Sequence, residues 1–331
     1  MSGPPAAVAA VRRAVRAACS DVAAGRLVLV ACSGGPDSLA LAAALAHEQQ
    51  HADWQAGLLT VDHGLQVGSA ERAGQVVAWA ASMGLAPAQV LAVTVTGPGG
   101  PEAAARQARY AALDEAAARL QAAAVLLGHT ADDQAETVLL GLARGSGARS
   151  LAGMAPVRGS YRRPLLDCPR TVTLAAAEHA GVPVWTDPHN SDDAYARARL
   201  RALLPELERA APGITAGLVR SAGLLRADAD ALDWWAARAS AQLTTAGVSG
   251  LSCAGLAELP AAVRTRVLRS AALAAGVPAG ALAAVHVRAL AELVCRFPGR
   301  GPVMLPGGVT AVRVSDRLSF PTSPGERRTE E

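Results

Sequence analysis

The sequence predicts an α/β fold with a doubly wound parallel sheet, followed by a smaller helical C-terminal domain that ends in a short β hairpin or meander. Residues 27–32 form an unbroken apolar run, LVLVAC, which is typical of a strand buried on both faces. Similar runs alternate with helix-forming segments as far as residue 143, and such alternation gives parallel βαβ units. Hydrophobic residues make up 51% of the 331 residues and charged residues 18%, so the chain can bury a sizeable core.

The expected elements of the first domain follow one another in a regular order. We expect strands at residues 27–32, 56–61, 90–95 and 122–127. We expect helices from residue 38 onward and at residues 70–83, 102–121 and 133–143. Small or polar residues follow three of these strands. Because the carboxyl ends of the strands line the ligand crevice of an open α/β sheet, we expect those residues to meet at one edge.

The rest of the chain is expected to be mainly helical. After a loop region we expect a helix at 173–179, a segment at 184–185 and a helix from about residue 195 past residue 201. A boundary near Ala210-Ala211-Pro212-Gly213 divides the chain into domains at 1–210 and 211–320, with a disordered tail at 321–331. In the second domain we expect helices at 214–243, 260–275 and 280–295, and then the hairpin or meander formed by PVML, VTAVRV and RLSF.

Composition excludes several kinds of chemistry. The sequence contains no lysine, so all 31 basic residues are arginine, which excludes a Walker A lysine, a lysine Schiff base and a lysine nucleophile. The net charge of +3 is weak evidence for a polyanionic partner, so only local arginine clusters can support one. The five cysteines are scattered without a CxxC pair, which disfavours a disulfide framework, a zinc knuckle and a cysteine-ligated iron–sulfur cluster and favours a reducing cytoplasm. We expect neither a signal peptide nor a membrane span, because no apolar run is long enough.

The strongest local signal is the sequence SGGPDS, which we call the glycine loop, between the first predicted strand and the helix after it. Its residues are Ser33, Gly34, Gly35, Pro36, Asp37 and Ser38. The glycines allow a tight turn and the close approach of a bulky anion, toward which the helix N-terminus directs free N–H groups. Asp37 would repel phosphate, so its presence indicates a Mg²⁺ ion or a cationic substrate. The alternative is a capped turn that holds no ligand.

A second candidate cluster comprises His129, Asp133 and Glu136. They are spaced four and three residues apart, so they share one face if the helix starts at once. Two carboxylates and an imidazole on such a face could hold the ammonium group of an amine substrate and later accept its protons. In the alternative, Asp132 and Asp133 only cap the helix N-terminus and Glu136 is a solvated first-turn acid.

Two further positions are candidates for contact with a nucleotide. Arg109 lies three residues after Arg106 on a predicted helix and could reach a polyphosphate or the negative charge that develops on phosphorus. The alternative is an exposed ion pair between Glu102 and Arg106, with Arg109 beside it. Asp62 and His63 follow the second predicted strand and could contact the ribose or adenine side. The alternative there is a loop aspartate that caps the next segment.

Taken together, these motifs resemble a known family. SGGPDS is similar to the pyrophosphate-binding loop of the N-type ATP pyrophosphatases, the PP-loop superfamily, whose fold is Rossmann-like. The order and spacing of the other motifs resemble the tRNA(Ile)-lysidine synthase family over about residues 27–207. Those motifs are VDHGL at 61–65, EAAARQARY at 102–110, GHTADDQAET at 128–137 and LARGSG at 142–147.

The resemblance implies an ATP-dependent ligase that acts on tRNA in the cytoplasm. ATP would adenylate the C2 oxygen of the cytidine at the first anticodon position of a minor isoleucine tRNA, whose anticodon is CAU, and pyrophosphate would leave. The ε-amine of free lysine would then displace AMP, giving lysidine. ATP is thus implied as a substrate and Mg²⁺ as its companion, with Asp37 as the candidate protein ligand. Domain 1–210 would bind ATP and catalyse, and domain 211–320 would orient the tRNA; a homodimer is left open.

Carried over to matching positions, the resemblance implies three groups of site residues. The ATP-binding group is Ser33, Gly34, Gly35, Pro36, Asp37, Ser38, Asp62 and His63. The catalytic group is Asp37, Arg109, His129, Asp133 and Glu136. The tRNA-binding group is Arg197, Arg201 and Arg144, for which a solvated basic helix face is the alternative. Arg197 is followed by Ala198 where the family has asparagine, so the match is incomplete at this point.

Other functions stay open at the level of sequence. A PP-loop tRNA thiolase would need sulfur-handling chemistry, usually paired cysteines, which this sequence lacks. Another ATP-pyrophosphatase amide or amine ligase would share the glycine loop. A non-catalytic nucleotide-binding module would use the loop as a sensor, and that function does not explain Asp37 together with the His129 cluster.

Overall fold

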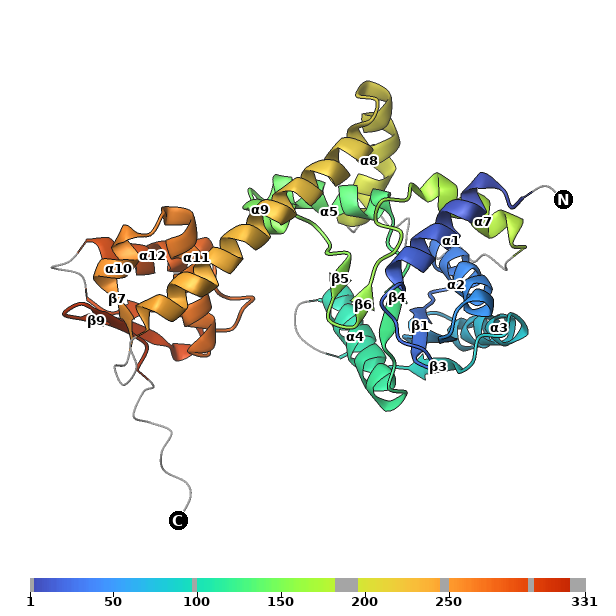
Figure 1. Cartoon of the computed structure of the whole chain (residues 1–331), viewed down its shortest axis with the longest axis horizontal. Coiled ribbons are helices and arrows are strands. Elements are labelled where there is room, and N and C mark those ends of the chain that lie inside the picture. The colour runs from blue at the N-terminus through green and yellow to red at the C-terminus, as the bar shows by residue number, and fades with distance from the viewer. Residues whose placement is uncertain (1–2, 97–99, 182–195, 245–249, 297–300, 322–331) are drawn as a thin grey trace, which may run out of the picture. The chain divides into compact units, whose positions relative to one another are not determined.

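The computed structural model describes residues 3–96, 100–181, 196–244, 250–296 and 301–321 (Figure 1). The chain divides into two compact units, Met1–Leu225 and Arg226–Glu331, and the division falls inside helix α9 (Ile214–Leu243). Each unit has a hydrophobic core of its own.

The first unit is built on a six-stranded sheet with the strand order β3-β2-β1-β4-β6-β5. The strands from β3 to β6 are parallel to their neighbours, and only β5 runs antiparallel, at the edge beside β6. Their bounds are β1 Leu27–Ala31, β2 Gln55–Asp62, β3 Ala88–Ala92, β4 Ala124–Leu127, β5 Val157–Arg158 and β6 Tyr161–Arg162. The predicted α/β class with a parallel sheet is confirmed.

The central strand β1 contributes to a core on each face of the sheet. Val28 and Val30 pack into the core formed with α1, α2 and α7, whereas Leu29 and Ala31 pack into the core formed with α4 (Figure 1). Alternate residues of a strand point to opposite faces, so a strand covered on both sides must be apolar throughout. This arrangement is why LVLVA is an unbroken apolar run.

Helices flank this sheet in the order that the alternation of the sequence predicts, with additions. Their bounds are α1 Ala6–Ala18, α2 Pro36–Glu48, α3 Ser69–Ser82, α4 Pro101–Arg119, α5 Ala131–Ala143, α6 Ala148–Leu151, α7 Arg170–His179 and α8 Ala196–Ala210. The predicted elements do not include α1, which carries three arginines and buries Val11 and Val15 on one face. The segment predicted at 184–185 lies outside the described residues.

The second unit combines helices with a small antiparallel sheet. After α9 come α10 (Cys253–Glu258), α11 (Ala261–Ala274) and α12 (Ala284–Cys295). The sheet has the order β7-β10-β9-β8, with β7 Leu251–Ser252, β8 Val303–Met304, β9 Thr310–Val314 and β10 Arg317–Ser319. The predicted meander at the end of the chain is confirmed, and the predicted tail lies outside the described residues from 322 onward. None of the helices in the described ranges combines the length and the apolar composition that a membrane span requires.

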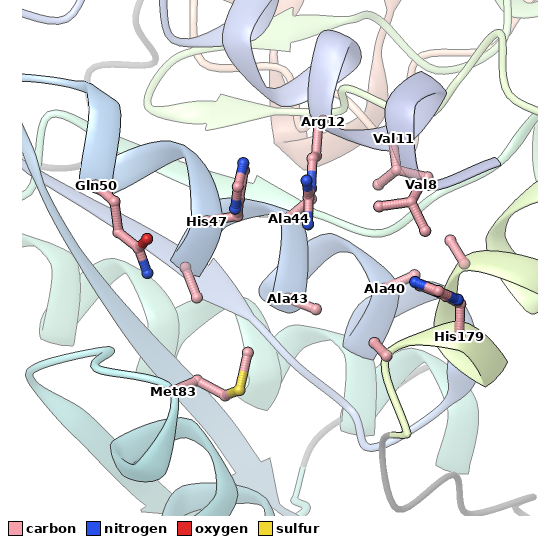
Figure 2. A pocket seen from close by; sticks show the side chains of 13 residues that line it. Val8, Val11, Arg12, Ala40, Ala43, Ala44, His47, Gln50, Met83 and His179 are labelled. Atoms are coloured by element: carbon pink, nitrogen blue, oxygen red, sulfur yellow. The ribbon is translucent and has the colours of Figure 1, made fainter. Parts of the chain in front are cut away.

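A cavity of about 290 Å³ lies among α1, α2 and α7 of the first unit (Figure 2). Its lining consists mainly of small and apolar side chains, together with the polar side chains of Arg12, His47, Gln50 and His179. None of the predicted site residues lines it. The predicted site lies instead at the carboxyl edge of the sheet.

Candidate active site

The glycine loop connects β1 to the N-terminus of α2 and is closed by Ser38. The Ser38 hydroxyl accepts a hydrogen bond from the Ser33 N–H at 3.1 Å and donates one to the Gly35 carbonyl at 2.9 Å. Gly34 has a φ of +79°, a left-handed conformation that glycine adopts without strain. No side chain caps the first turn of α2, so its N–H groups are free to bind an anion.

Gly128, directly after β4, allows the backbone at this point to lie close to the glycine loop. A Cβ atom built on Gly128 would lie 3.0 Å from the Cα and 3.1 Å from the backbone nitrogen of Ser38. These contacts involve backbone atoms, so a side chain at position 128 must displace the start of α2.

Replacing Gly128 by alanine should therefore lower ATP-dependent turnover about tenfold or more, because misplacing a binding group by a fraction of an ångström misaligns the reacting atoms. The measurement is ATP–pyrophosphate exchange at saturating ATP in the presence of tRNA. Gly74→Ala is the matched control, since nothing lies within 4 Å of its Cβ position in α3. Equal rates in the two variants would show that the tight approach at Gly128 has no role in activity.

Asp133 combines two roles at the start of α5. Thr130 and Asp133 form a reciprocal capping box, in which the Asp133 Oδ2 atom accepts the Thr130 N–H at 2.8 Å. The Oδ1 atom accepts hydrogen bonds from Arg170 at 2.7 Å and Arg201 at 3.0 Å. Burial alone would raise the pKa of Asp133, but Arg170, the Thr130 N–H and Arg201 lower it below its usual range. Capping of the helix therefore accounts for only one of the two oxygens of this carboxylate, Oδ2.

Glu136 is fully buried, with 0% of its surface exposed, and is not a solvated first-turn acid. The Arg201 Nε atom donates to its Oε1 atom at 2.8 Å, and the guanidinium groups of Arg170 and Arg197 lie within 3.7 Å of its carboxylate. Asp133 and Glu136 thus lie on the same side of α5, as their spacing predicts.

Asp37 is linked to Asp133 and Glu136 by a side chain of α7, that of Arg170. The hydroxyl of Thr173 donates to its Oδ1 atom, and the Arg170 Nε atom donates to its Oδ2 atom at 3.3 Å. Burial raises the pKa of Asp37, against the opposing effects of Thr173 and Arg170. We call Asp37, Asp133 and Glu136 the acid cluster, because Arg170 contacts all three carboxylates.

The predicted site residues do not include Arg170 and Thr173, which contact Asp37. Arg170 is the first residue of α7, and its backbone N–H donates to Asp132 Oδ2 at 2.7 Å. The available signal was Pro169 directly before a helix with an arginine in its first turn. That pattern predicts the helix start, but it does not predict which carboxylates the arginine contacts.

The structure places the three predicted tRNA-binding arginines differently from one another. Arg197 and Arg201 share a face of α8, and both contact α5: Arg197 donates to Thr137 at 3.1 Å, while Arg201 contacts the acid cluster. Arg144 is exposed at the C-terminus of α5, about 16 Å along that helix from Asp133 by helix geometry. The structure therefore brings two of the three together, and their contact with tRNA stays a prediction.

Arg109 lies close enough to His63 and His129 for its charge to act on both imidazoles. The Nδ1 atoms of His63 and His129 are buried, and among the described residues neither has a hydrogen-bond partner. Burial lowers the pKa of Arg109, and burial together with the nearby charge of Arg109 lowers the pKa of His63. Asp62 accepts the Gly64 N–H at 2.9 Å, as the loop-capping alternative describes, and its contact with a nucleotide stays a prediction.

Burial lowers the pKa of His129 to about 3, so this imidazole is neutral at pH 7. Between its ordinary pKa near 6.5 and this value, the unfolded chain binds a proton that the folded chain does not, so stability falls with falling pH. Between pH 7 and pH 5 the free energy of unfolding should fall by about 2 kcal/mol less in His129→Gln than in the natural protein. Urea unfolding at both pH values measures this difference. The exposed His51, replaced by glutamine, is the control, and an unchanged pH dependence in His129→Gln would contradict the assignment.

Protein side chains alone do not make a metal site here. Across the part of the chain that the structure describes, no group of three or more histidine, cysteine, aspartate or glutamate side chains is arranged to hold a metal ion. Mg²⁺ is usually bound through one or two carboxylates together with substrate phosphates. Asp37, the carboxylate within the glycine loop, fits that mode.

Comparison with family models defines the class of protein. The model of the PP-loop domain matches residues 8–207, and the model of the TilS substrate binding domain matches residues 251–319. A glycine loop at the carboxyl edge of a parallel sheet, within the matched PP-loop region, places the chain among the PP-loop proteins. The U34-tRNA thiolase NcsA from Methanococcus maripaludis with its [4Fe-4S] cluster has the same fold, with a TM-score of 0.57 and 19% identity, over 66% of this chain and 80% of that one.

Whole-chain relatives identify the family. The tRNA(Ile)-lysidine synthase of Thermobifida fusca (strain YX) is 60% identical, over 93% of this chain and 95% of the relative. That of Streptomyces coelicolor is 57% identical, over 88% of this chain and 84% of the relative. That of Salinispora arenicola is 53% identical, over 96% of this chain and 96% of the relative. The chain belongs to the tRNA(Ile)-lysidine synthase family, as its motifs predict.

Proposed function

We propose that this chain is an ATP-dependent ligase that joins free lysine to C2 of the first-position cytidine in the CAU anticodon of a minor isoleucine tRNA, forming lysidine. The observation that carries the proposal is the acid cluster, held beside the glycine loop by Arg170 in a chain of this family. The loop suits a polyphosphate and the carboxylates suit an amine, so the two halves of the reaction have adjacent sites.

The first half of the reaction uses ATP. The C2 oxygen of cytosine attacks the α-phosphorus, the bond to the β-phosphate oxygen breaks, and pyrophosphate leaves. The free N–H groups at the start of α2 and the hydroxyl of Ser33 are suited to bind the pyrophosphate end. Arg109 carries positive charge in a partly buried position, where it would stabilise charge developing on phosphorus. Mg²⁺ bound to the phosphates and to Asp37 would neutralise negative charge on ATP.

The second half of the reaction uses lysine. The acid cluster holds the ε-ammonium group, one carboxylate accepts a proton, and the free amine attacks C2 while AMP leaves with the C2 oxygen. Burial raises the pKa of Asp37, which makes this carboxylate a better proton acceptor than a solvated one. Adenylation replaces a poor leaving group by a good one, so one difficult step becomes two easier ones.

The tRNA must present its cytosine outside the anticodon stack to reach this site. The match of residues 251–319 to a substrate binding domain supports a role for the second unit in orienting tRNA. We assign Arg197, Arg201 and Arg144 to the tRNA backbone contact of the first unit. We also propose that the enzyme works in the cytoplasm.

The test is incorporation of radiolabelled lysine into an unmodified tRNA transcript with the CAU anticodon. We expect incorporation only with ATP, and ATP–pyrophosphate exchange only with tRNA. A transcript with a UAU anticodon is the control, since it has no cytidine at the first position. Absence of incorporated lysine, or exchange that needs lysine but not tRNA, would overturn the proposal.

Cysteine placement argues against sulfur transfer as the function. Cys32 comes closest to the glycine loop, but it is only 2% exposed, and burial raises its pKa, so it is a poor nucleophile. Cys168, half-buried, also has a pKa raised by burial. These two thiols belong to the first unit, as does buried Cys19, whereas Cys253 and Cys295 belong to the second.

A further inference from the structure

Arg163 is a buried cation that the proposed reaction does not yet use. Only 7% of the residue is exposed. Its Nη1 atom donates to the Ala155 carbonyl at 2.8 Å, whereas its Nε atom is buried and has no hydrogen-bond partner among the described residues. Over the same described ranges, no carboxylate is in ion contact with it. Arginine is almost never fully buried unless it is paired, so a site of this kind suits a ligand that supplies the negative charge.

The alternation along β6 directs Arg163 to the face of the sheet that α4 covers. Tyr161 packs into the core on that face, whereas Arg162 contacts the Ala18 carbonyl and Asp21 on the face that α1 covers. Residues two apart on a strand point to the same face, so Arg163, directly after β6, follows Tyr161.

At this edge of the sheet Arg163 has a second arginine in its neighbourhood. The charges of Arg163 and Arg109 both act on the buried imidazole of His129, which follows β4. Asp133 acts on the same imidazole with the opposite sign, but its carboxylate already binds arginines of α7 and α8. In the sheet order β1-β4-β6, Arg163 lies two strands from the strand that leads into the glycine loop, about 10 Å across the sheet.

Neutral groups hold Arg163 in place. Gln134 of α5, which is only 5% exposed, donates to the Met154 carbonyl at 3.1 Å and accepts the Met154 N–H at 2.7 Å. The next residue, Ala155, provides the carbonyl that binds the guanidinium. The position of Arg163 is thus fixed without a counter-ion, so its charge is available to a ligand and needs no rearrangement on binding.

We infer that Arg163, together with Arg109, forms a second phosphate site at the carboxyl edge of the sheet, separate from the glycine loop. The source of the phosphate rests on the proposed function: it is the α-phosphate of ATP or the backbone phosphate of the extruded cytidine. Arginine binds phosphate through two parallel N–H bonds. Because Ala155 engages Nη1, the edge formed by Nε and Nη2 is the one that binds the phosphate oxygens.

Affinities of the full-length protein for two phosphate-bearing probes test the inference. The probes are α,β-methylene-ATP with Mg²⁺, measured by isothermal titration calorimetry, and the CAU transcript, measured by filter binding. In Arg163→Gln we expect at least one affinity to fall about tenfold or more, because a charge-assisted contact is lost. The probe whose binding weakens identifies the source of the phosphate. Arg163→Lys keeps the charge without the fork, so its affinity for that probe should lie between the other two.

Arg162→Gln is the matched control, because it removes the neighbouring arginine from the opposite face of the sheet. It should bind both probes like the natural protein. Thermal unfolding without ligand gives an independent measurement. Since Arg163 has no counter-ion to lose among the described residues, Arg163→Gln should unfold within about 2 °C of the natural protein, or above it.

Three results would overturn the inference. The first is natural affinity for both probes in a folded Arg163→Gln protein, and the second is the same result in Arg163→Lys. The third is a melting temperature of Arg163→Gln lowered by about 6 °C or more, as expected when a buried ion pair is broken. Lysine incorporation by the natural protein, measured in parallel, separates the two proposals. Without incorporation the proposed function fails, whereas incorporation with unchanged affinities in the Arg163 variants removes only the second phosphate site.

Discussion

Replacing Asp37 by asparagine should lower turnover by about 10²- to 10³-fold or more while the protein stays folded, because this carboxylate acts where charge changes during the reaction. It is the only member of the acid cluster within the glycine loop, and its two oxygens accept hydrogen bonds from Thr173 and Arg170. Asparagine has nearly the same shape but offers one acceptor and no charge. The measurements are ATP–pyrophosphate exchange with tRNA and lysine incorporation.

The control for this variant is Asp53→Asn, at an exposed position outside the site. Thermal unfolding followed by circular dichroism checks that both proteins fold. If Asp37→Asn turned over at the natural rate, Asp37 would have no part in binding the amine or Mg²⁺. If exchange persisted while lysine incorporation was lost, Asp37 would act in the second half of the reaction only.

Replacing Arg170 by alanine should both destabilise the protein and inactivate it. The loss removes a side chain that contacts all three acids and leaves their buried charges short of a partner. Breaking a buried ion pair in this way typically costs about 3–5 kcal/mol. Without Arg170 the pKa of Asp133 should rise, because this arginine is the largest of the effects that lower it. Asp133 then takes up a proton at higher pH than in the natural protein.

Urea unfolding at pH 7 measures the loss of stability, and lysine incorporation measures the loss of activity. Arg209→Ala is the control, since exposed pairs contribute only about 0–1 kcal/mol. If Arg170→Ala lost no more stability than Arg209→Ala, the acids would not depend on Arg170. Arg170→Lys should restore part of the stability but not the contact with all three carboxylates, because a single ammonium cannot reproduce the planar fork of arginine.

The parallel sheet could be predicted from the sequence because each central strand is a continuous apolar run. β1 and β4 are buried on both faces, and runs such as LVLVA and AVLL are typical of a strand between two helix layers. β5 and β6 could not be predicted, since each has only two residues and includes an arginine. Their strand conformation comes from pairing with each other and of β6 with β4, which is a tertiary contact and leaves no periodic pattern.

The candidate site could be predicted only in part, for a related reason. Spacing along one helix predicts that Asp133 and Glu136 lie on the same side of α5, and they do. It carries no information about partners 37 and 68 residues away, and these are the separations of Arg170 and Arg201 from Asp133. The sequence therefore predicts a negative site for an amine, whereas the structure has arginines against its carboxylates.

Among the described residues, the cations in ion contact with the acid cluster are guanidinium groups, and the sequence has no lysine. A protonated guanidinium has no lone pair free for attack, whereas an ε-amine in the same place would become a nucleophile whenever it lost its proton. Any ε-amine on the protein itself could attack the adenylated cytosine in place of free lysine. The sequence contains no lysine, so free lysine has no competing ε-amine on the protein. The protein therefore cannot become attached to the adenylated cytidine through a lysine side chain of its own.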